Sequence, residues 1–204
     1  MTTPAKVLFL TADLGGNVPP TLAVAEELAR RGAVVEIAGL QTVRPPLVHV
    51  PFPPATQTSD KGLRRGGALF SLMAGRRAAA EVGRLVGARH PDVPVVDCLL
   101  PAPLRGALDT GAPVVVLFPT FGGFWIHDFD TGVAGRIFGL LGLRPSTLWN
   151  RATARLLLTD AELDPGRDDP ALVGYDWTGT TEQCPAAVGG QGRPRVLVAL
   201  SNTD

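Results

Sequence analysis

Residues 6–32 constrain the fold more than any other part of the sequence, because a strand, a glycine loop and a helix follow one another there without interruption. The run Val7 to Thr11 is apolar and favours β structure, and glycines at 15 and 16 end it. Pro19 and Pro20 suit the first turn of a helix, where a missing N–H costs nothing, and Gly32 supplies the left-handed stop. Ligands of open parallel sheets bind at the carboxyl ends of strands, so we expect the chemistry to begin in loop 13–18.

The rest of the chain continues this alternation of strands and helices. We expect apolar strands at Ala33–Leu40, Leu47–Val50 (an edge strand), Asp92–Leu100, Gly111–Phe118 and Leu156–Thr159. Helices are expected in 61–89 (one long, or two broken at a glycine), from about 103 to 110, and in 132–143 and 145–154. Segment 119–130, aromatic and glycine-containing, reads as a loop at a strand end, and 160–169 as an acidic loop. The pattern predicts an α/β fold, a Rossmann-like parallel sheet of six or seven strands with helices on both faces.

Composition and charge exclude several classes of partner. The 204 residues suit one sizeable domain, and Lys+Arg equals Asp+Glu at 19 each, which gives no electrostatic case for nucleic acid or an anionic membrane. No stretch reaches the roughly 18 apolar residues of a membrane span, and the first residues do not form a signal peptide. We therefore expect a cytoplasmic protein without a membrane span. The abundance of Ala, Arg, Gly and Pro is typical of a high-GC bacterial genome.

Cysteines and arginines suggest no further site. Cys98 and Cys184 match no metal or redox spacing, so neither a metal site nor a disulfide is expected, and Cys98 is predicted to be a small buried hydrophobe. The arginines in 61–89 scatter around the helical wheel, which favours a solvated helix face over a basic patch.

The glycine loop also suggests a dinucleotide site, with Glu36 as the acid that binds the ribose. The spacing does not fit G-x-G-x-x-G, two prolines stand where a phosphate would need N–H groups, and Glu36 falls inside a strand. An unrelated nucleotide-binding enzyme is therefore the remotest of the alternatives.

Several motifs, taken in order, resemble nucleotide-sugar-dependent glycosyltransferases of the GT-B fold, of the macrolide and UDP-glucosyl or UDP-glucuronosyl type. The family pattern Gly-His-x-x-Pro before a helix ending in Arg-Gly is similar to Gly16-Asn17-Val18-x-Pro20 and the helix that follows. The resemblance continues through Pro94–Leu99, Gly111–Thr120 and Leu163-Asp164-Pro165, and ends at Arg193–Thr203. It covers essentially the whole chain and implies the amino-terminal, acceptor-binding domain of such an enzyme.

The resemblance implies an inverting transfer from a UDP- or dTDP-sugar to a small hydroxylated acceptor, without a further cofactor. In the family a His on the first loop deprotonates the acceptor and an Asp at the end of the fourth strand orients that His. Asp97 matches the orienting Asp, but Asn17 stands at the base position, and an amide accepts no proton near neutral pH. Asn17 is left with two roles, orienting an acceptor hydroxyl or capping the helix. Asp97 is either the orienter or a structural cap or ion-pair partner, and Asp13 is an alternative base.

The acceptor pocket is expected on the same edge of the sheet. By resemblance it includes Gly16 and Thr120, with aromatic walls; an ordinary hydrophobic cluster is the alternative interpretation of those aromatic residues. His49, His90 and His127 are expected to be incidental, although His127 lies on an active-edge loop. The expected wall residues are Phe121, Phe124 and Trp125.

The predicted organisation is an acceptor-binding domain at 1–182, a linker at 183–194, and the first strand of a donor-binding domain at 195–204, with Ser201 at the edge of the donor site. The remaining donor-binding domain, with its pyrophosphate loop, is missing. The leading hypothesis is therefore half of a bacterial glycosyltransferase of secondary metabolism, inactive as this isolated chain. The main alternative is a non-catalytic protein, either a truncated remnant or a module that binds a small molecule.

Overall fold

The computed structural model describes residues 3–14, 16–52 and 63–179. The predicted linker at 183–194, the predicted strand at 195–204, Ser201 and Cys184 lie outside the described residues, so those expectations remain predictions.

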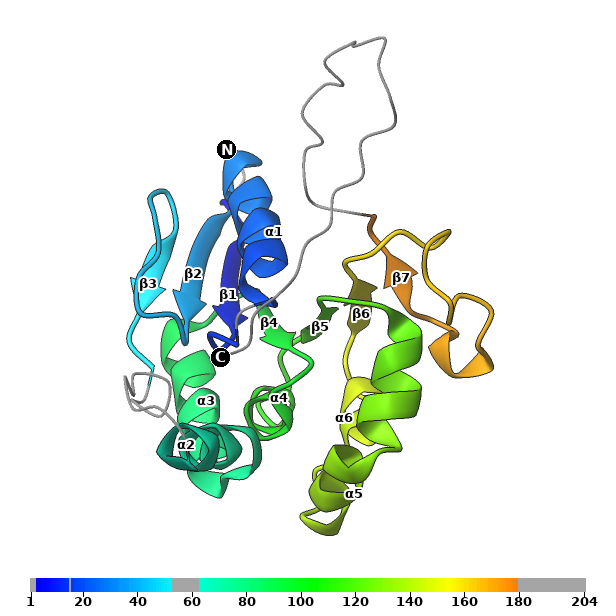
Figure 1. Cartoon of the computed structure of the whole chain (residues 1–204). Helices are drawn as coiled ribbons and strands as arrows, with labels where there is room; N and C mark the ends of the chain where they lie inside the picture. The colour runs from blue at the N-terminus through cyan, green and yellow to red at the C-terminus, as the bar shows by residue number, and fades with distance from the viewer. Residues whose placement is uncertain (1–2, 15, 53–62, 180–204) are drawn as a thin grey trace, which may run out of the picture.

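The core of the molecule is a seven-stranded sheet in which every pairing is parallel (Figure 1). The strand order is β3-β2-β1-β4-β5-β6-β7: the chain adds β2 and β3 on one side of β1, and β4 to β7 on the other. The carboxyl ends of β1 and β4 are therefore neighbours. The strands are β1 (Lys6–Leu10), β2 (Val34–Ala38), β3 (Val48–Val50), β4 (Val93–Asp97), β5 (Val115–Phe118), β6 (Ala154–Leu157) and β7 (Asp176–Trp177).

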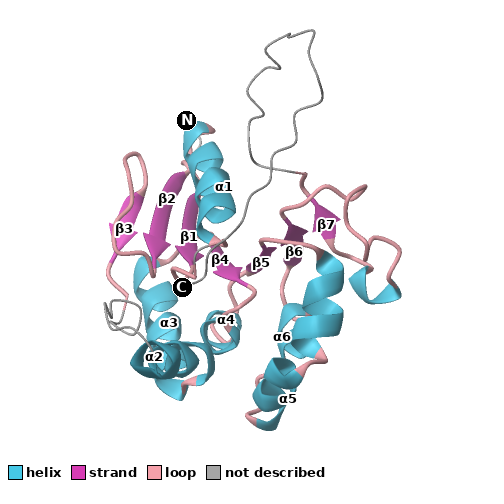
Figure 2. Cartoon of the chain, in the orientation of Figure 1, coloured by secondary structure: helices cyan, strands magenta, loops and turns pink. Residues whose placement is uncertain are grey.

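Helices cover both faces of this sheet, as predicted (Figure 2). On one face α1 (Val18–Arg30) packs over Val7, Phe9, Val35 and Ile37. The other face carries the remaining helices over Leu8, Leu10 and Val96. They are α2 (Leu63–Ala74), α3 (Arg76–Arg89), α4 (Pro101–Leu108), the π-helix η2 (Phe124–Asp130), α5 (Val133–Leu140) and α6 (Pro145–Trp149), with a short 3₁₀ turn η3 (Pro170–Leu172) after β6.

Helix boundaries follow the local sequence signals. Proline occupies the first turn of α1, and Gly32 follows its end with a φ of 94°. The segment 61–89 breaks into two helices at Gly75, where a Cβ would overlap the carbonyl oxygen of Ser71. Helix α4 begins at Pro101, two residues before the predicted start, again with proline in its first turn.

The structure corrects several sequence-based expectations. Segment 119–130 is mostly helical, because Trp125 and Phe129 pack inward in an aromatic cluster that a loop would leave exposed. Strands β4 and β5 are shorter than the apolar runs that predicted them. The two-residue strand β7 was not predicted, since Asp176-Trp177 is too short to show a period. No helix among the described residues is long and apolar enough to span a bilayer.

Candidate functional site

A buried polar cluster joins the ends of β1 and β4 at the carboxyl edge of the sheet. Thr11 follows β1, Asn17 precedes α1 and Asp97 ends β4, and their exposed fractions are 1%, 4% and 4%. Because β1 and β4 pair in parallel, residues 86 positions apart meet here without any local sequence signal. The fold thus brings together Asn17 and Asp97, the two residues assigned by resemblance to the base and orienter positions.

Every hydrogen of the Asn17 amide is engaged within the protein. Its Nδ2 donates to Asp97 Oδ2 at 2.6 Å and to the carbonyl of Ala12 at 2.9 Å, with Thr11 Oγ1 at 3.2 Å. Its Oδ1 accepts the N–H of Leu14 at 3.2 Å. The opposite amide orientation would place oxygen against a carboxylate and a carbonyl, so the contacts fix the assignment. The side chain does not cap α1; it closes the loop onto Asp97.

Asp97 is a buried carboxylate held by neutral donors. Its Oδ2 accepts from Asn17 and from the Thr11 hydroxyl at 3.3 Å, and its Oδ1 accepts the N–H of Leu99 at 2.9 Å. Burial raises the pKa of Asp97 above its ordinary value, although the donors from Leu99, Asn17, Thr11 and the Cys98 thiol oppose the shift. The structure shows no arginine or lysine paired with it among the described residues.

Cys98 is buried and free, as predicted. Burial raises the pKa of its thiol well above the ordinary value, and the charge of Asp97 adds to the shift. A thiol in this state is a poor nucleophile, so the polar chemistry of the cluster rests on Asp97 and Asn17.

The other predicted residues of the first loop are more accessible. Asp13 is exposed, and Gly16 is exposed with open space where a Cβ would project. Both follow β1, so they lie at the same edge of the sheet as Asn17. The roles of Asp13 as an alternative base and of Gly16 in acceptor binding remain predictions.

The predicted aromatic wall divides into an inner and an outer part. Trp125 is only 3% exposed and packs against the rings of Phe118, Phe124 and Phe129, as a core residue does. Phe121 and Phe124 are 41% and 44% exposed and Thr120 is half-buried. Only Phe121 and Phe124 therefore offer open aromatic surface beyond the end of β5.

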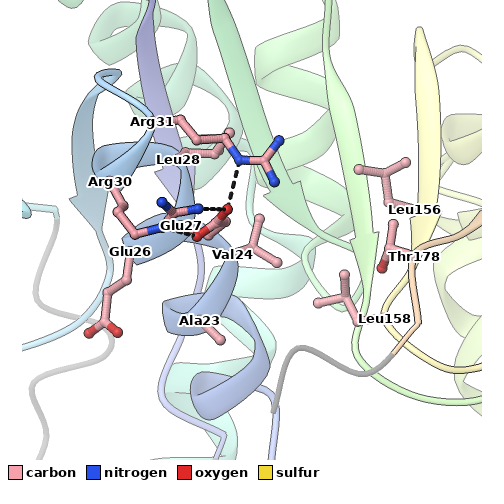
Figure 3. A pocket seen from close by; sticks show the side chains of 10 residues that line it. All are labelled: Ala23, Val24, Glu26, Glu27, Leu28, Arg30, Arg31, Leu156, Leu158 and Thr178. Atoms are coloured by element: carbon pink, nitrogen blue, oxygen red, sulfur yellow. Dashed lines mark hydrogen bonds and ion pairs between the residues drawn. The ribbon is translucent and has the colours of Figure 1, made fainter. Parts of the chain in front are cut away.

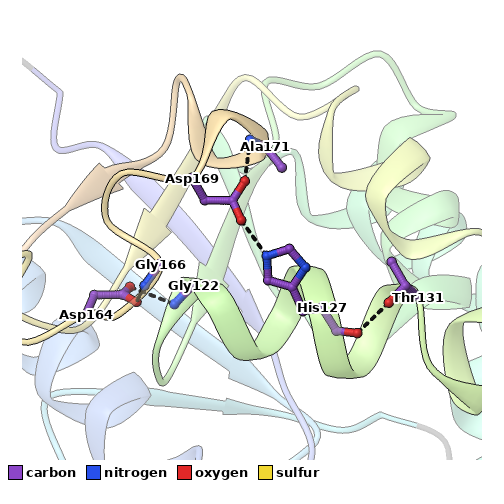
Figure 4. A network of polar contacts seen from close by, with 7 residues as sticks. All are labelled: Gly122, His127, Thr131, Asp164, Gly166, Asp169 and Ala171. Atoms are coloured by element: carbon purple, nitrogen blue, oxygen red, sulfur yellow. Dashed lines mark hydrogen bonds and ion pairs between the residues drawn. The ribbon is translucent and has the colours of Figure 1, made fainter.

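Asp164 anchors the loop after β5 to the loop after β6 (Figure 4). Its Oδ2 accepts the N–H of Gly122 at 2.7 Å and the indole N–H of Trp177 at 3.0 Å, and its Oδ1 accepts the N–H of Gly166 at 2.9 Å. Burial alone would raise the pKa of Asp164, but these donors outweigh it and hold the pKa below its ordinary value. Leu163-Asp164-Pro165, a motif of the resemblance, is thus a structural anchor.

A second pair at this edge joins His127 of η2 to Asp169, which caps η3 (Figure 4). The N–H of Ala171 and the His127 ring both hold the pKa of Asp169 below its ordinary value. The His127 side chain is 63% exposed. The pair therefore joins the middle of η2 to the loop after β6 at the surface, and His127 has a structural partner that the sequence did not reveal.

A cavity of about 950 Å³ lies away from this cluster, between α1 and the β6 end of the sheet (Figure 3). Its walls include Val24, Leu28, Leu156 and Leu158, and its charged rim carries Glu27 with Arg30 and Arg31. Those arginines bond to Glu27 and lower its pKa to about 2. Since neither Asn17 nor Asp97 lines this cavity, we do not assign it to the candidate site.

The dinucleotide site considered from the sequence finds no support in the geometry. Glu36 is 6% exposed in the middle of β2 and faces Lys6 at 3.6 Å and Arg89 at 3.3 Å, so it does not stand at the strand end where a ribose-binding acid is expected. Among the described residues, no group of three or more His, Cys, Asp and Glu side chains is placed to hold a metal ion.

Comparison with solved structures identifies the fold. The glycotransferase of kitacinnamycin superposes over 95% of this chain with a TM-score of 0.66 and 19% identity. A UDP-glucosyltransferase from Polygonum tinctorium covers 95% with a TM-score of 0.62 and 13% identity, and Phytolacca americana UGT2 covers 91% with a TM-score of 0.56 and 16% identity. The fold is that of the amino-terminal half of a GT-B glycosyltransferase.

The match is incomplete in length and is carried by structure alone. The chain spans 56% of each of these three solved chains, about half of their length. No family model matches the sequence, and no curated protein matches it. At such identities the likeness establishes the fold, and the activity has to be argued from the site.

Proposed function

We propose that this chain is the acceptor-binding half of a nucleotide-sugar glycosyltransferase that acts on a small hydroxylated acceptor. The observation that carries the proposal is the 2.6 Å contact between Asn17 and Asp97, at the carboxyl edge where a GT-B enzyme binds its acceptor. The structural neighbours include glycosyltransferases whose solved complexes hold UDP or UDP-2fluoro-glucose. The donor is accordingly proposed to be a UDP- or dTDP-sugar, bound by a carboxyl-terminal domain beyond this chain.

The proposed acceptor is one that needs little help from a base, such as an acidic phenol. Asn17 cannot take a proton near neutral pH, and its two amide hydrogens are spent on Asp97 and Ala12. One lone pair of Oδ1 remains available to orient a hydroxyl. Phe121 and Phe124, exposed beyond β5, are proposed to provide the aromatic walls of the acceptor pocket.

The test is to restore the base in a chain fused to the donor-binding half of a UDP-glucosyltransferase. A histidine at position 17 can donate one ring N–H to Asp97 and present the other nitrogen to an acceptor. Asn17→His should raise transfer to an alcohol acceptor by about a hundredfold, within the range of general-base catalysis. Asn17→Gln is the matched control, because it keeps an amide at that position.

Two results decide where the base lies. If Asn17→His leaves the rate unchanged while Asp13→Ala abolishes it, Asp13 is the base and the role proposed for Asn17 is wrong. Adding Asp97→Asn to the histidine variant should remove the gain, because the ring then loses the carboxylate that orients it and stabilises its charged form.

The second candidate function is a non-catalytic module that binds the acceptor without turnover. It is favoured by the engagement of both Asn17 amide hydrogens within the protein, which resembles a structural clamp more than a reactive group. An Asn17→His fusion that binds acceptor and donor yet transfers no sugar would support this alternative.

A further inference from the structure

An apolar stripe on the outside of α5 sets this helix apart from an ordinary surface helix. Val133, Ile137, Leu140 and Leu141 are 75%, 41%, 89% and 52% exposed, while Phe138 on the opposite side is 3% exposed. Helix α5 is therefore apolar on its inner and its outer face, a pattern expected where both faces are covered. Phe70 of α2, 47% exposed, stacks on Phe138 at 6.2 Å, so a further partly exposed apolar side chain lies where α2 meets α5.

Three arginines without a carboxylate partner among the described residues stand near this stripe. Helix α5 and the first turn of α3 contain no Asp or Glu, although the whole chain is balanced at 19 of each sign. Arg76, Arg77 and Arg136 are exposed, and among the described residues no carboxylate pairs with any of them. The balanced composition thus conceals an arginine-bearing apolar surface, which we call the α2–α5 patch: Phe70, Arg76, Arg77, Val133, Arg136, Ile137, Leu140 and Leu141.

A hollow of about 570 Å³ connects the arginines to the apolar stripe. Arg76 and Arg105 line it on one side and Leu140 and Leu141 on the other. Asp109 also lines it, but its carboxylate is bound to Arg105 at 2.7 Å and to Arg151 at 3.0 Å. The hollow therefore offers cationic groups next to exposed leucines.

We propose that the α2–α5 patch binds the surface of an anionic lipid bilayer. A bilayer interface supplies an apolar layer for the leucines and negative headgroups for the arginines, which is the combination that this patch complements. Helix α5 has eight residues, about 12 Å of helix at 1.5 Å per residue, so it lies in the interface and does not cross it. A second copy is a poorer occupant, because a two-fold contact through this patch would set arginines against arginines.

The test is co-sedimentation of this 204-residue chain with vesicles of phosphatidylcholine mixed with phosphatidylglycerol, and with vesicles of phosphatidylcholine alone. We expect binding to the anionic vesicles, weakened by salt, and much weaker binding to the neutral ones. Leu140→Glu should lower the partition coefficient about tenfold, since a charge replaces a leucine that the proposal places in the apolar layer of the bilayer. Charge reversal in Arg76→Glu/Arg77→Glu should lower it by at least about tenfold.

Matched controls separate the patch from general effects. Val173→Glu replaces an apolar residue just after η3 that is 79% exposed, against 89% for Leu140, and Arg30→Glu/Arg31→Glu reverses two charges at the end of α1, on the opposite face of the sheet. Both controls should bind as the wild type does, with unchanged circular dichroism in all variants. The proposal is overturned if the chain does not bind anionic vesicles, or if the test and control variants bind them alike. It is also overturned if the chain forms a dimer that binds no vesicles and Leu140→Glu converts that dimer to a monomer.

Discussion

The contact between Asn17 and Asp97 is the residue-scale feature on which both proposed functions depend. A buried carboxylate without a cationic partner is costly, and here three neutral donors at 2.6–3.3 Å reduce that cost. Thr11 takes part as donor to Asp97 and as a further acceptor for Asn17. The cluster therefore stabilises the loop after β1 as well as the proposed site, and its variants report on both.

Removing the Asn17 side chain should destabilise the protein. Asn17→Ala leaves Asp97 without its shortest donor and Ala12 without a partner for its carbonyl, at a cost of about 2–4 kcal/mol in the free energy of unfolding. Urea denaturation of the wild type and the variant measures this loss in the free energy of unfolding. Asn150→Ala is the control, because Asn150 is exposed and its side chain bonds, among the described residues, to the half-buried Arg155 alone, so it should lose less than about 0.5 kcal/mol. Equal losses in the two variants would contradict a buried amide clamp.

The raised pKa of Asp97 predicts a characteristic pH dependence. Above its ordinary pKa of 3.8 the unfolded chain releases the proton, while the folded protein holds it until the raised pKa is reached. The stability of the wild type relative to Asp97→Asn should therefore be highest below pH 3.8 and fall as pH rises through the raised pKa, then level off. Parallel urea titrations of the two proteins across this range provide the measurement, and a difference that grows with pH would refute it.

At the scale of elements, how much could be predicted depended on how local the signal was. Helix α1 and its proline start, the edge strand β3 and the break at Gly75 follow from residues within one turn of each boundary. Segment 119–130 does not show its helical form in the sequence, because that form depends on Phe138 and Trp149, which lie 9 and 20 residues beyond Phe129. The anchoring role of Asp164 was also hidden in the sequence, because two of its donors, Gly122 and Trp177, lie 42 and 13 residues away.

The crossing of α3 and α4 makes a prediction that belongs to this scale. A Cβ at Gly106 would overlap the carbonyl oxygen of Ala79, so Gly106→Ala should force the helices apart and cost about 2 kcal/mol or more. Gly87→Ala is the matched control within α3, because nothing lies within 4 Å of its Cβ position. The control should be neutral or stabilise by about 0.5–1 kcal/mol through helix propensity. Thermal unfolding of both variants measures this difference in stability. If Gly106→Ala unfolds at the same temperature as Gly87→Ala, the close contact between α3 and α4 does not exclude a side chain at position 106.

For the whole molecule, the order of the motifs identified the fold although each motif alone was weak. The sheet order, with β1 and β4 adjacent, brings the first loop to the end of β4 as the resemblance implied, and the solved neighbours share that architecture. The sequence could not reveal that both hydrogens of the Asn17 amide are engaged, because their partners Asp97 and Ala12 are brought to Asn17 by folding. Nor could net charge reveal the α2–α5 patch, because charges cancel over the chain but not over its surface.

The proposed separation of acceptor and donor sites between two domains leads to a prediction for these 204 residues. The proposed donor site lies in a domain that this chain, at about half the length of its structural neighbours, does not supply. Calorimetric titration of the 204 residues with UDP-glucose should therefore show no binding tighter than about 1 mM. The fusion to a donor-binding half, titrated in the same way, is the positive control. Micromolar binding by the chain alone would place a nucleotide site within these residues, and the acceptor-half account would have to be abandoned.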